Sequence, residues 1–239
     1  MRVWDLNPGY LDRQRLLGEH VEIHAAYSIL KNGFDGYSAH PEVIRWKGRL
    51  AALWLRHALV AAEMDIRGYN HNSPLPDPEG KAVWPEVYVT PPHKQIMLLA
   101  EKFGGLHGGR IPLPANPYQL WAQYKYSVMA RDVDLYRSIG KAVAARKEPM
   151  IRLVEKLVET MRQKPSPGMA QNALSHMWSH VKRFSSLDRQ PENPAVLLEN
   201  VIILAMAHDV DYIKHSTALS DLRIWIDKAK KSPVEEDAA

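Results

Sequence analysis

The chain has 239 residues and a net charge of +4, from 31 basic and 27 acidic side chains, and it contains no cysteine. Hydrophobic residues make up 46% and charged residues 24%, a composition typical of folded globular proteins. Without cysteine, this chain cannot supply a disulfide, a thiolate nucleophile, a cysteine-ligated zinc site or an iron–sulfur cluster. No apolar run approaches the ~20 residues of a membrane span, and the first residues do not form a signal peptide. We therefore expect a cytoplasmic protein that does not interact with a membrane.

Helical periodicity dominates the first half of the sequence, and β-type alternation is scarce. Apolar side chains recur at three- and four-residue steps in residues 14–30, which predicts an amphipathic helix. The same spacing predicts a helix over residues 42–67, ending before Gly68, since glycine favours the left-handed position after a helix. A shorter helix is predicted from Pro91 or Pro92 to Phe103, with Thr90 as its N-cap.

The second half continues the helical pattern. Helices are predicted over residues 118–130, 134–145, 149–163, 169–184, 194–208 and 217–230. The expected fold class is all-α, either two small helical domains or one extended helical array. The glycine- and proline-rich residues 104–117 are the candidate boundary, which predicts domains at 1–110 and 118–230. An ordered loop over one continuous core is the other interpretation of that stretch.

The first predicted helix carries the densest set of chemical groups. Glu19 and Glu22 are three residues apart and share one face, whereas His20 and His24 are four apart and share another edge. The two histidines could ligate a metal ion, but they do not form an H-E-x-x-H motif and the sequence places no third ligand. Partly buried histidines with ordinary hydrogen bonds are the simpler interpretation, so we predict no metal and no cofactor.

Three short segments carry a resemblance to a known family. They are Met1-Arg-Val-Trp-Asp-Leu6, Arg15-Leu-Leu-Gly-Glu-His-Val-Glu-Ile23 and Arg67-Gly-Tyr69, with His40 and Leu55-Arg-His57 between them. Together they resemble the pyrimidine-dimer DNA glycosylases of the phage endonuclease V type, over roughly residues 1–100. The resemblance implies a glycosylase domain at the N-terminus.

The resemblance also implies a mechanism. In this family the α-amino group of the mature first residue attacks C1′ of the damaged nucleotide, the base leaves, a Schiff base forms, and β-elimination nicks the strand. Because Arg2 matches the family's arginine after the nucleophile, the nucleophilic amine falls on Met1. Glu22 matches the catalytic glutamate, and Glu19 matches a second acidic residue one turn earlier. An α-amino group ordinarily has a pKa of about 7.7–8.0, so a useful fraction is neutral near neutral pH.

The expected partner is double-stranded DNA with damaged pyrimidines, which would make the protein nucleoid-associated when it acts. Val21 stands where family members often carry a phosphate-gripping arginine, and this departure bears on dimer recognition. Trp4, Tyr10, Trp46 and Trp54 either stack on an unstacked base or belong to the core. Contacts to DNA are expected from a set of basic residues and histidines: Arg2, Arg13, Arg15, His20, His24, His40, Arg45, Lys47 and Arg56.

A second resemblance covers roughly residues 118–220. The runs Tyr124-Lys-Tyr-Ser-Val-Met-Ala130 and Tyr136-Arg-Ser-Ile-Gly-Lys-Ala-Val-Ala144 are similar to the YbgA-like helical domain family. This resemblance implies a helical accessory domain and no settled activity. Its interleaved lysines, arginines and tyrosines could hold a nucleic-acid backbone, or they could form a solvated helix face.

These observations predict a DNA-repair glycosylase with AP-lyase activity. Two alternatives stay open. One is a non-catalytic protein that binds a nucleic acid or another partner. The other is a metal-dependent hydrolase that uses His20, Glu22 and His24.

Overall fold

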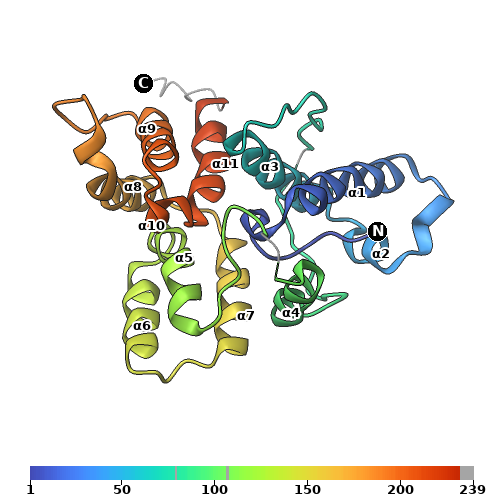
Figure 1. Cartoon of the computed structure of the whole chain (residues 1–239). Coiled ribbons are helices and arrows are strands. Elements are labelled where there is room, and N and C mark those ends of the chain that lie inside the picture. The colour runs from blue at the N-terminus through green and yellow to red at the C-terminus, as the bar shows by residue number, and fades with distance from the viewer. Residues whose placement is uncertain (79, 106–107, 232–239) are drawn as a thin grey trace, which may run out of the picture.

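The structure is a computed structural model that describes residues 1–78, 80–105 and 108–231, and within these residues it contains helices and no strand (Figure 1). The predicted all-α class is therefore confirmed. The first half contains η1 (Pro8–Tyr10), α1 (Arg13–Asn32), η2 (Gly36–Ala39), α2 (Pro41–Trp46), α3 (Leu50–Ile66) and α4 (Pro92–Phe103). The second half contains α5 (Pro117–Met129), α6 (Val133–Ala144), α7 (Met150–Met161), α8 (Pro167–Val181), η3 (Lys182–Phe184), α9 (Pro194–Ala207), α10 (Asp211–Lys214) and α11 (Ala218–Lys231).

The ends of α1 follow from local sequence. The Asp12 side chain accepts a hydrogen bond from the backbone N–H of Arg15 at 2.8 Å, which caps the first turn. Gly33 closes the helix in the left-handed conformation, with φ of 69°. The helix predicted over residues 14–30 is thus confirmed and runs slightly longer at both ends.

Two details of the predicted helices are wrong. The single helix predicted over residues 42–67 is broken into α2 and α3, because the chain turns at Gly48, where φ is 73°. Thr90 does not cap α4, whose N-cap is Pro91 without a side-chain hydrogen bond. The Thr90 hydroxyl instead accepts a hydrogen bond from Arg2 Nη1 at 3.3 Å. The predicted end before Gly68 is confirmed, with φ of 70° at that glycine.

The helices pack around two groups of buried apolar side chains. The first joins the N-terminal segment and α1–α4 to α5, α6 and α7. The second lies mainly among α8, α9 and α11 and also takes in side chains of α5. Figure 1 shows α11 between α9 and α3, and α4 beside α7, in agreement with the packing contacts. The two sequence halves therefore share buried surface, each fully buried large apolar side chain contributing roughly 1.5–3 kcal/mol.

The glycine- and proline-rich stretch lies against the N-terminal part. Ile111 is fully buried, and its backbone N–H donates to Gly9 O at 2.8 Å. The Arg110 guanidinium forms an ion pair with buried Glu63 of α3 at 2.7 Å. Residues 106 and 107 of the proposed boundary lie outside the described residues. The division into domains at 1–110 and 118–230 stays a prediction.

Among the described residues, no helix is both long enough and apolar enough to cross a bilayer.

Candidate functional site

The N-terminal segment is held in the interior by hydrogen bonds to its backbone. The Trp4 N–H donates to Glu19 Oε1 of α1 at 2.8 Å, and Arg56 Nη1 of α3 donates to Leu6 O at 2.7 Å. Glu19 and Arg56 also pair with each other through two contacts of 2.8 Å. Burial raises the pKa of the Glu19 carboxyl, and the Arg56 guanidinium opposes that effect. Glu19 therefore fixes the backbone of the N-terminal segment at Trp4 against α1.

A second set of buried charged groups holds the other side of the segment. Arg45 of α2 donates to Val3 O at 2.9 Å and forms ion pairs with Asp5 at 3.1 Å and Glu42 at 2.7 Å. Gln95 of α4 accepts from the Asp5 N–H at 2.9 Å and donates to the Asp5 carboxylate at 2.8 Å. Residues 3–6 are thus fixed by groups from α1, α2, α3 and α4. Such a segment does not behave as a frayed chain end.

This fixed segment brings the α-amino group of Met1 to Glu22. The Met1 nitrogen lies 3.7 Å from Glu22 Oε1, within ion-pair range. The Met1 side chain is 5% exposed and packs on the core, whereas the Glu22 side chain is 37% exposed. An amine and a carboxylate are therefore adjacent where solvent has access to the carboxylate. An amine beside a carboxylate is the pairing needed for nucleophilic attack assisted by proton transfer.

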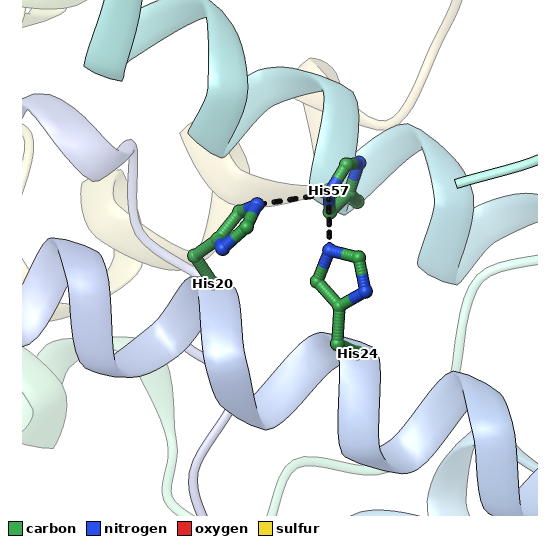
Figure 2. Close-up of side chains that lie close together, drawn as sticks. All are labelled: His20, His24 and His57. Carbon is green, nitrogen blue, oxygen red and sulfur yellow. Dashed lines mark hydrogen bonds between the residues drawn. The ribbon is translucent and has the colours of Figure 1, made fainter. Parts of the chain in front are cut away.

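Three histidines from α1 and α3 converge close to Glu22 along the chain. Figure 2 shows His20 and His24 of α1 pointing toward His57 of α3. His57 Nε2 lies 3.1 Å from His24 Nε2 and 3.1 Å from His20 Nε2. The ring of His71 adds an edge-on contact to His20, with ring centroids 5.1 Å apart. The sequence identified His20 and His24 as a pair and His57 only as part of the family resemblance. The packing of α3 on α1 brings His57 to the other two.

The histidines are held in their neutral forms. Burial, followed by the imidazoles of His24 and His71, lowers the pKa of His20 to about 4. Burial, followed by the neighbouring histidines, lowers the pKa of His57 to about 3. Burial also lowers the pKa of His24, against the opposing effect of a hydrogen bond with the backbone of Ser73. At neutral pH these rings therefore carry lone pairs rather than positive charge.

An open cavity of about 830 Å³ adjoins the histidines. His57 and His71 line it together with Trp54, Tyr69 and Arg223, so both halves of the sequence contribute to its wall. The cavity is large enough for a small-molecule ligand.

The basic residues predicted to contact DNA lie in different environments. Arg13 and Lys47 are exposed. Arg2 is half-buried, and its guanidinium lies 5.0 Å from the centroid of the Trp4 ring. Arg15 pairs with Asp12 on the first turn of α1.

The remaining members of that predicted set serve the fold in this structure. Arg45 and Arg56 are buried in the ion pairs described above, so they have no free face for a phosphate. His40 caps α2 by accepting from the Glu42 N–H at 3.1 Å. His20 is 9% exposed and lies in the histidine group.

The aromatic residues proposed as stacking groups are mostly in the core. Trp4, Tyr10 and Trp46 are 5%, 0% and 1% exposed, respectively. Trp54 is half-buried and donates its indole N–H to Leu75 O at 3.0 Å. In this conformation the core interpretation holds for the three buried rings.

Two of the basic residues of the second half form internal contacts. Arg131 makes a buried bidentate ion pair with Asp221, at 2.7 and 2.8 Å. Lys125 lies over the rings of Tyr126 and Tyr212 and hydrogen-bonds the latter's hydroxyl. Burial lowers the pKa of Lys125. Neither group offers the continuous basic stripe that would grip a nucleic-acid backbone.

Comparison with known families confirms both resemblances. Residues 1–77 match the family described as pyrimidine dimer DNA glycosylase. Residues 125–199 match a family described as a protein of unknown function, DUF1722. No curated protein and no solved structure matches the chain. The N-terminal match includes Met1, Glu22 and the four clustered histidines His20, His24, His57 and His71. The first 77 residues therefore carry the signature of a DNA glycosylase family.

Proposed function

We propose that this chain is a DNA-repair glycosylase with AP-lyase activity on damaged pyrimidines, in which the α-amino group of Met1 is the nucleophile and Glu22 assists it. The observation that carries the proposal is the 3.7 Å separation between the Met1 nitrogen and Glu22 Oε1. The family match of residues 1–77 supplies the substrate class, DNA containing pyrimidine dimers. The proposal takes Met1 as the mature first residue.

The chemistry requires one amine and one proton-transfer group. The neutral amine attacks C1′ of the damaged nucleotide, and the C1′–base bond breaks with its electron pair leaving on the base. One of the two amine protons is transferred to the departing base, and opening of the C1′–O4′ bond, with protonation of O4′, gives the protonated Schiff base between C1′ and the Met1 nitrogen. Removal of a C2′ proton then expels the 3′ phosphate by β-elimination, and water releases the enzyme. Glu22 is placed to donate and accept protons beside that nitrogen, a role typically worth 10²–10⁴-fold in rate.

Glu19 acts in this proposal as a positioning residue. Its carboxylate is buried and already occupied by Arg56 and the Trp4 N–H. It is therefore not free to exchange protons with substrate. It fixes residues 4–6, and through them the α-amino group, against α1. Preorganising a nucleophile in this way is a recognised source of catalytic rate.

DNA binding in this proposal relies on the exposed cations near the N-terminal helices. Arg13 and Lys47 are exposed, although the Arg13 guanidinium also lies 5.7 Å from the centroid of the Tyr69 ring, and Arg2 follows the nucleophile directly. A few such contacts give salt-sensitive, sequence-independent affinity for double-stranded DNA. The protein would then be associated with the nucleoid while it acts.

The second half has a supporting role in the proposal. We assign residues 118–230 as an accessory helical domain next to a glycosylase domain at 1–110. Helix α11 packs on α3, and α7 packs on α4, so the accessory helices brace two of the helices that hold the N-terminal segment.

Displacing the α-amino group from Met1 by one residue tests the proposal. We would compare untagged protein, whose mature first residue is checked by intact mass spectrometry, with a form that carries one additional glycine before Met1. A C-terminally tagged form is the control for the effect of a tag. The proposal predicts that the extended form loses nicking of UV-irradiated duplex DNA while the C-terminally tagged form keeps it. Full nicking by the extended form would contradict the assignment of the amine.

A further inference from the structure

We propose that His20, His24 and His57 form a binding site for one divalent transition-metal ion of the zinc class. The three side chains come from two helices, and their candidate ligand nitrogens all lie within 4.8 Å of one another. None of them is Met1 or Glu22, so the site is separate from the proposed amine chemistry and does not depend on it.

Hydrogen bonding among the rings does not satisfy all three nitrogens. His57 Nε2 lies 3.1 Å from Nε2 of both His20 and His24. A neutral ring nitrogen carries either one proton or one lone pair, so His57 Nε2 can make only one good hydrogen bond. If His57 Nε2 makes a good hydrogen bond to one of the other two rings, its contact with the second ring has no proton between the two nitrogens. Alternatively, one proton or one lone pair of His57 is divided between both contacts, and both hydrogen bonds are weak. A cation between the rings removes this conflict because each ring can offer it a lone pair.

The distances suit a metal with little adjustment. Zinc–nitrogen bonds of ~2.0–2.1 Å in a tetrahedron imply nitrogens about 3.3–3.4 Å apart. The two closest separations here are 3.1 Å. The three nitrogens lie within 4.8 Å of one another, so rotations of the His20 and His24 side chains would bring the set to the separations that the ion requires.

The donor set selects the kind of metal. Within the described residues the group contains three histidines and no carboxylate. Imidazole nitrogens suit zinc, copper, iron and nickel, whereas magnesium and calcium prefer oxygen ligands. Three protein ligands with a fourth position taken by water is the usual form of an open zinc site.

The surroundings provide two further features of a metal site. The ring of His24 hydrogen-bonds with the backbone of Ser73, and a metal-bound histidine usually makes such a bond through its second nitrogen. Nε2 of His71 is buried without a hydrogen-bond partner among the described residues. That atom lies on a ring that contacts both His20 and His57. It is available to a water molecule or other ligand on the metal.

The adjoining cavity provides access. His57 and His71 both line the space of about 830 Å³. We therefore place the fourth ligand, a water molecule or an oxygen atom of a small ligand, on the side of the cavity.

Metal binding is tested on the untagged full-length protein, purified without chelators. Metal content is measured by mass spectrometry of the intact protein and by elemental analysis. Apoprotein is then titrated with Co²⁺, whose visible absorption reports tetrahedral nitrogen ligation, and Zn²⁺ is used in competition. The variants are His57→Gln and His24→Gln, the second at a half-exposed side chain where misfolding is less of a concern. His176→Gln, at an exposed histidine of α8, is the control.

The proposal predicts one ion per chain with submicromolar affinity. It predicts that His24→Gln and His57→Gln each weaken Co²⁺ binding by on the order of 100-fold or more, judged from the 10–100-fold effect of losing even an outer-shell partner. His176→Gln should bind as the parent does. Circular dichroism confirms that each variant keeps its helices. Absence of a tetrahedral Co²⁺ spectrum, or affinity unchanged in folded His24→Gln and His57→Gln, would overturn the proposal whatever the result of the nicking assay.

Discussion

Glu19 and Arg56 form a bidentate ion pair between α1 and α3, with both nitrogen–oxygen distances at 2.8 Å. Each partner also holds the N-terminal segment, Glu19 through the Trp4 N–H and Arg56 through Leu6 O. The position of the Met1 amine is therefore set by a salt bridge in the core, which holds the backbone at Trp4, three residues farther along the chain.

Glu19→Gln should destabilise the fold and impair nicking. The substitution leaves Arg56 buried without a counter-charge, and breaking a buried pair in this way costs about 3–5 kcal/mol. Urea unfolding measures the loss. The control is Glu101→Gln, at an exposed position of α4, which should change stability by less than about 0.5 kcal/mol. If Glu19→Gln were as stable as Glu101→Gln, the pair would not anchor the segment.

Glu22→Gln should impair nicking without destabilising the fold. Because the Glu22 side chain is 37% exposed and its ion pair among the described residues is with the amine, we expect little change in urea unfolding. Single-turnover nicking of UV-irradiated duplex should fall by roughly 10²–10⁴-fold, the usual contribution of a proton-transfer group. Nicking at the parent rate in a folded Glu22→Gln protein would remove Glu22 from the mechanism.

Arg13→Ala and Lys47→Ala should weaken DNA binding without affecting the fold. Each exposed cation that contacts a phosphate contributes about one unit to the slope of log affinity against log salt. Duplex binding measured across a salt series should therefore show a shallower slope for each variant. Arg189→Ala, another exposed arginine, lies beyond α8 and should leave the slope unchanged. If Arg13→Ala and Lys47→Ala both kept the slope of the parent protein, as Arg189→Ala should, the DNA would not contact Arg13 or Lys47.

The buried carboxylate of Glu63 should make stability depend on pH. Burial by itself would raise the pKa of Glu63, but Arg110 and Arg67 outweigh burial and lower it. The folded state therefore favours the ionised form, and this stabilisation is complete above the ordinary pKa of glutamate. It is lost as the pH falls through the lowered folded pKa.

Glu63→Gln tests this dependence. At neutral pH the variant should lose about 3–5 kcal/mol, because Arg110 and Arg67 keep no carboxylate partner at this site. The difference from the parent in urea unfolding should shrink as the pH is lowered below the ordinary glutamate pKa. The exposed pair of Asp134 and Arg137 provides the control, and Asp134→Asn should show a small effect at every pH. A pH-independent difference for Glu63→Gln would contradict the assignment.

Local patterns in the sequence predicted the helices well because the signals that define them are local. Apolar spacing, together with Gly68 after a helix, requires no knowledge of tertiary contacts. The break at Gly48 was missed because the apolar spacing continues across it. The four-residue α10 was also missed, since so short a helix presents no periodicity to detect.

The sequence identified several residues of the candidate site but not their contacts, because those contacts form only when the helices pack. Met1, Glu19 and Glu22 were identified from a family resemblance. The sequence could not show that Glu19 is buried in a pair with Arg56 whereas Glu22 is partly exposed, because both residues carry the same charge. Arg45 and Arg56 were assigned to DNA because isolated arginines usually lie on the surface. Their buried partners become evident only when α1, α2 and α3 pack together. The same packing brings His57 to His20 and His24, at a separation of 37 residues from His20.

The most direct test of the central claim is borohydride trapping of the covalent intermediate. Untagged protein would be incubated with UV-irradiated duplex and with an abasic-site duplex, reduced, and digested, and the crosslinked peptide identified by mass spectrometry. The account predicts a reduced adduct on the Met1 nitrogen with both substrates. An adduct with the abasic duplex alone would keep the amine chemistry and contradict pyrimidine-dimer excision. Folded protein that gives no adduct, or one attached to a lysine, would contradict the account.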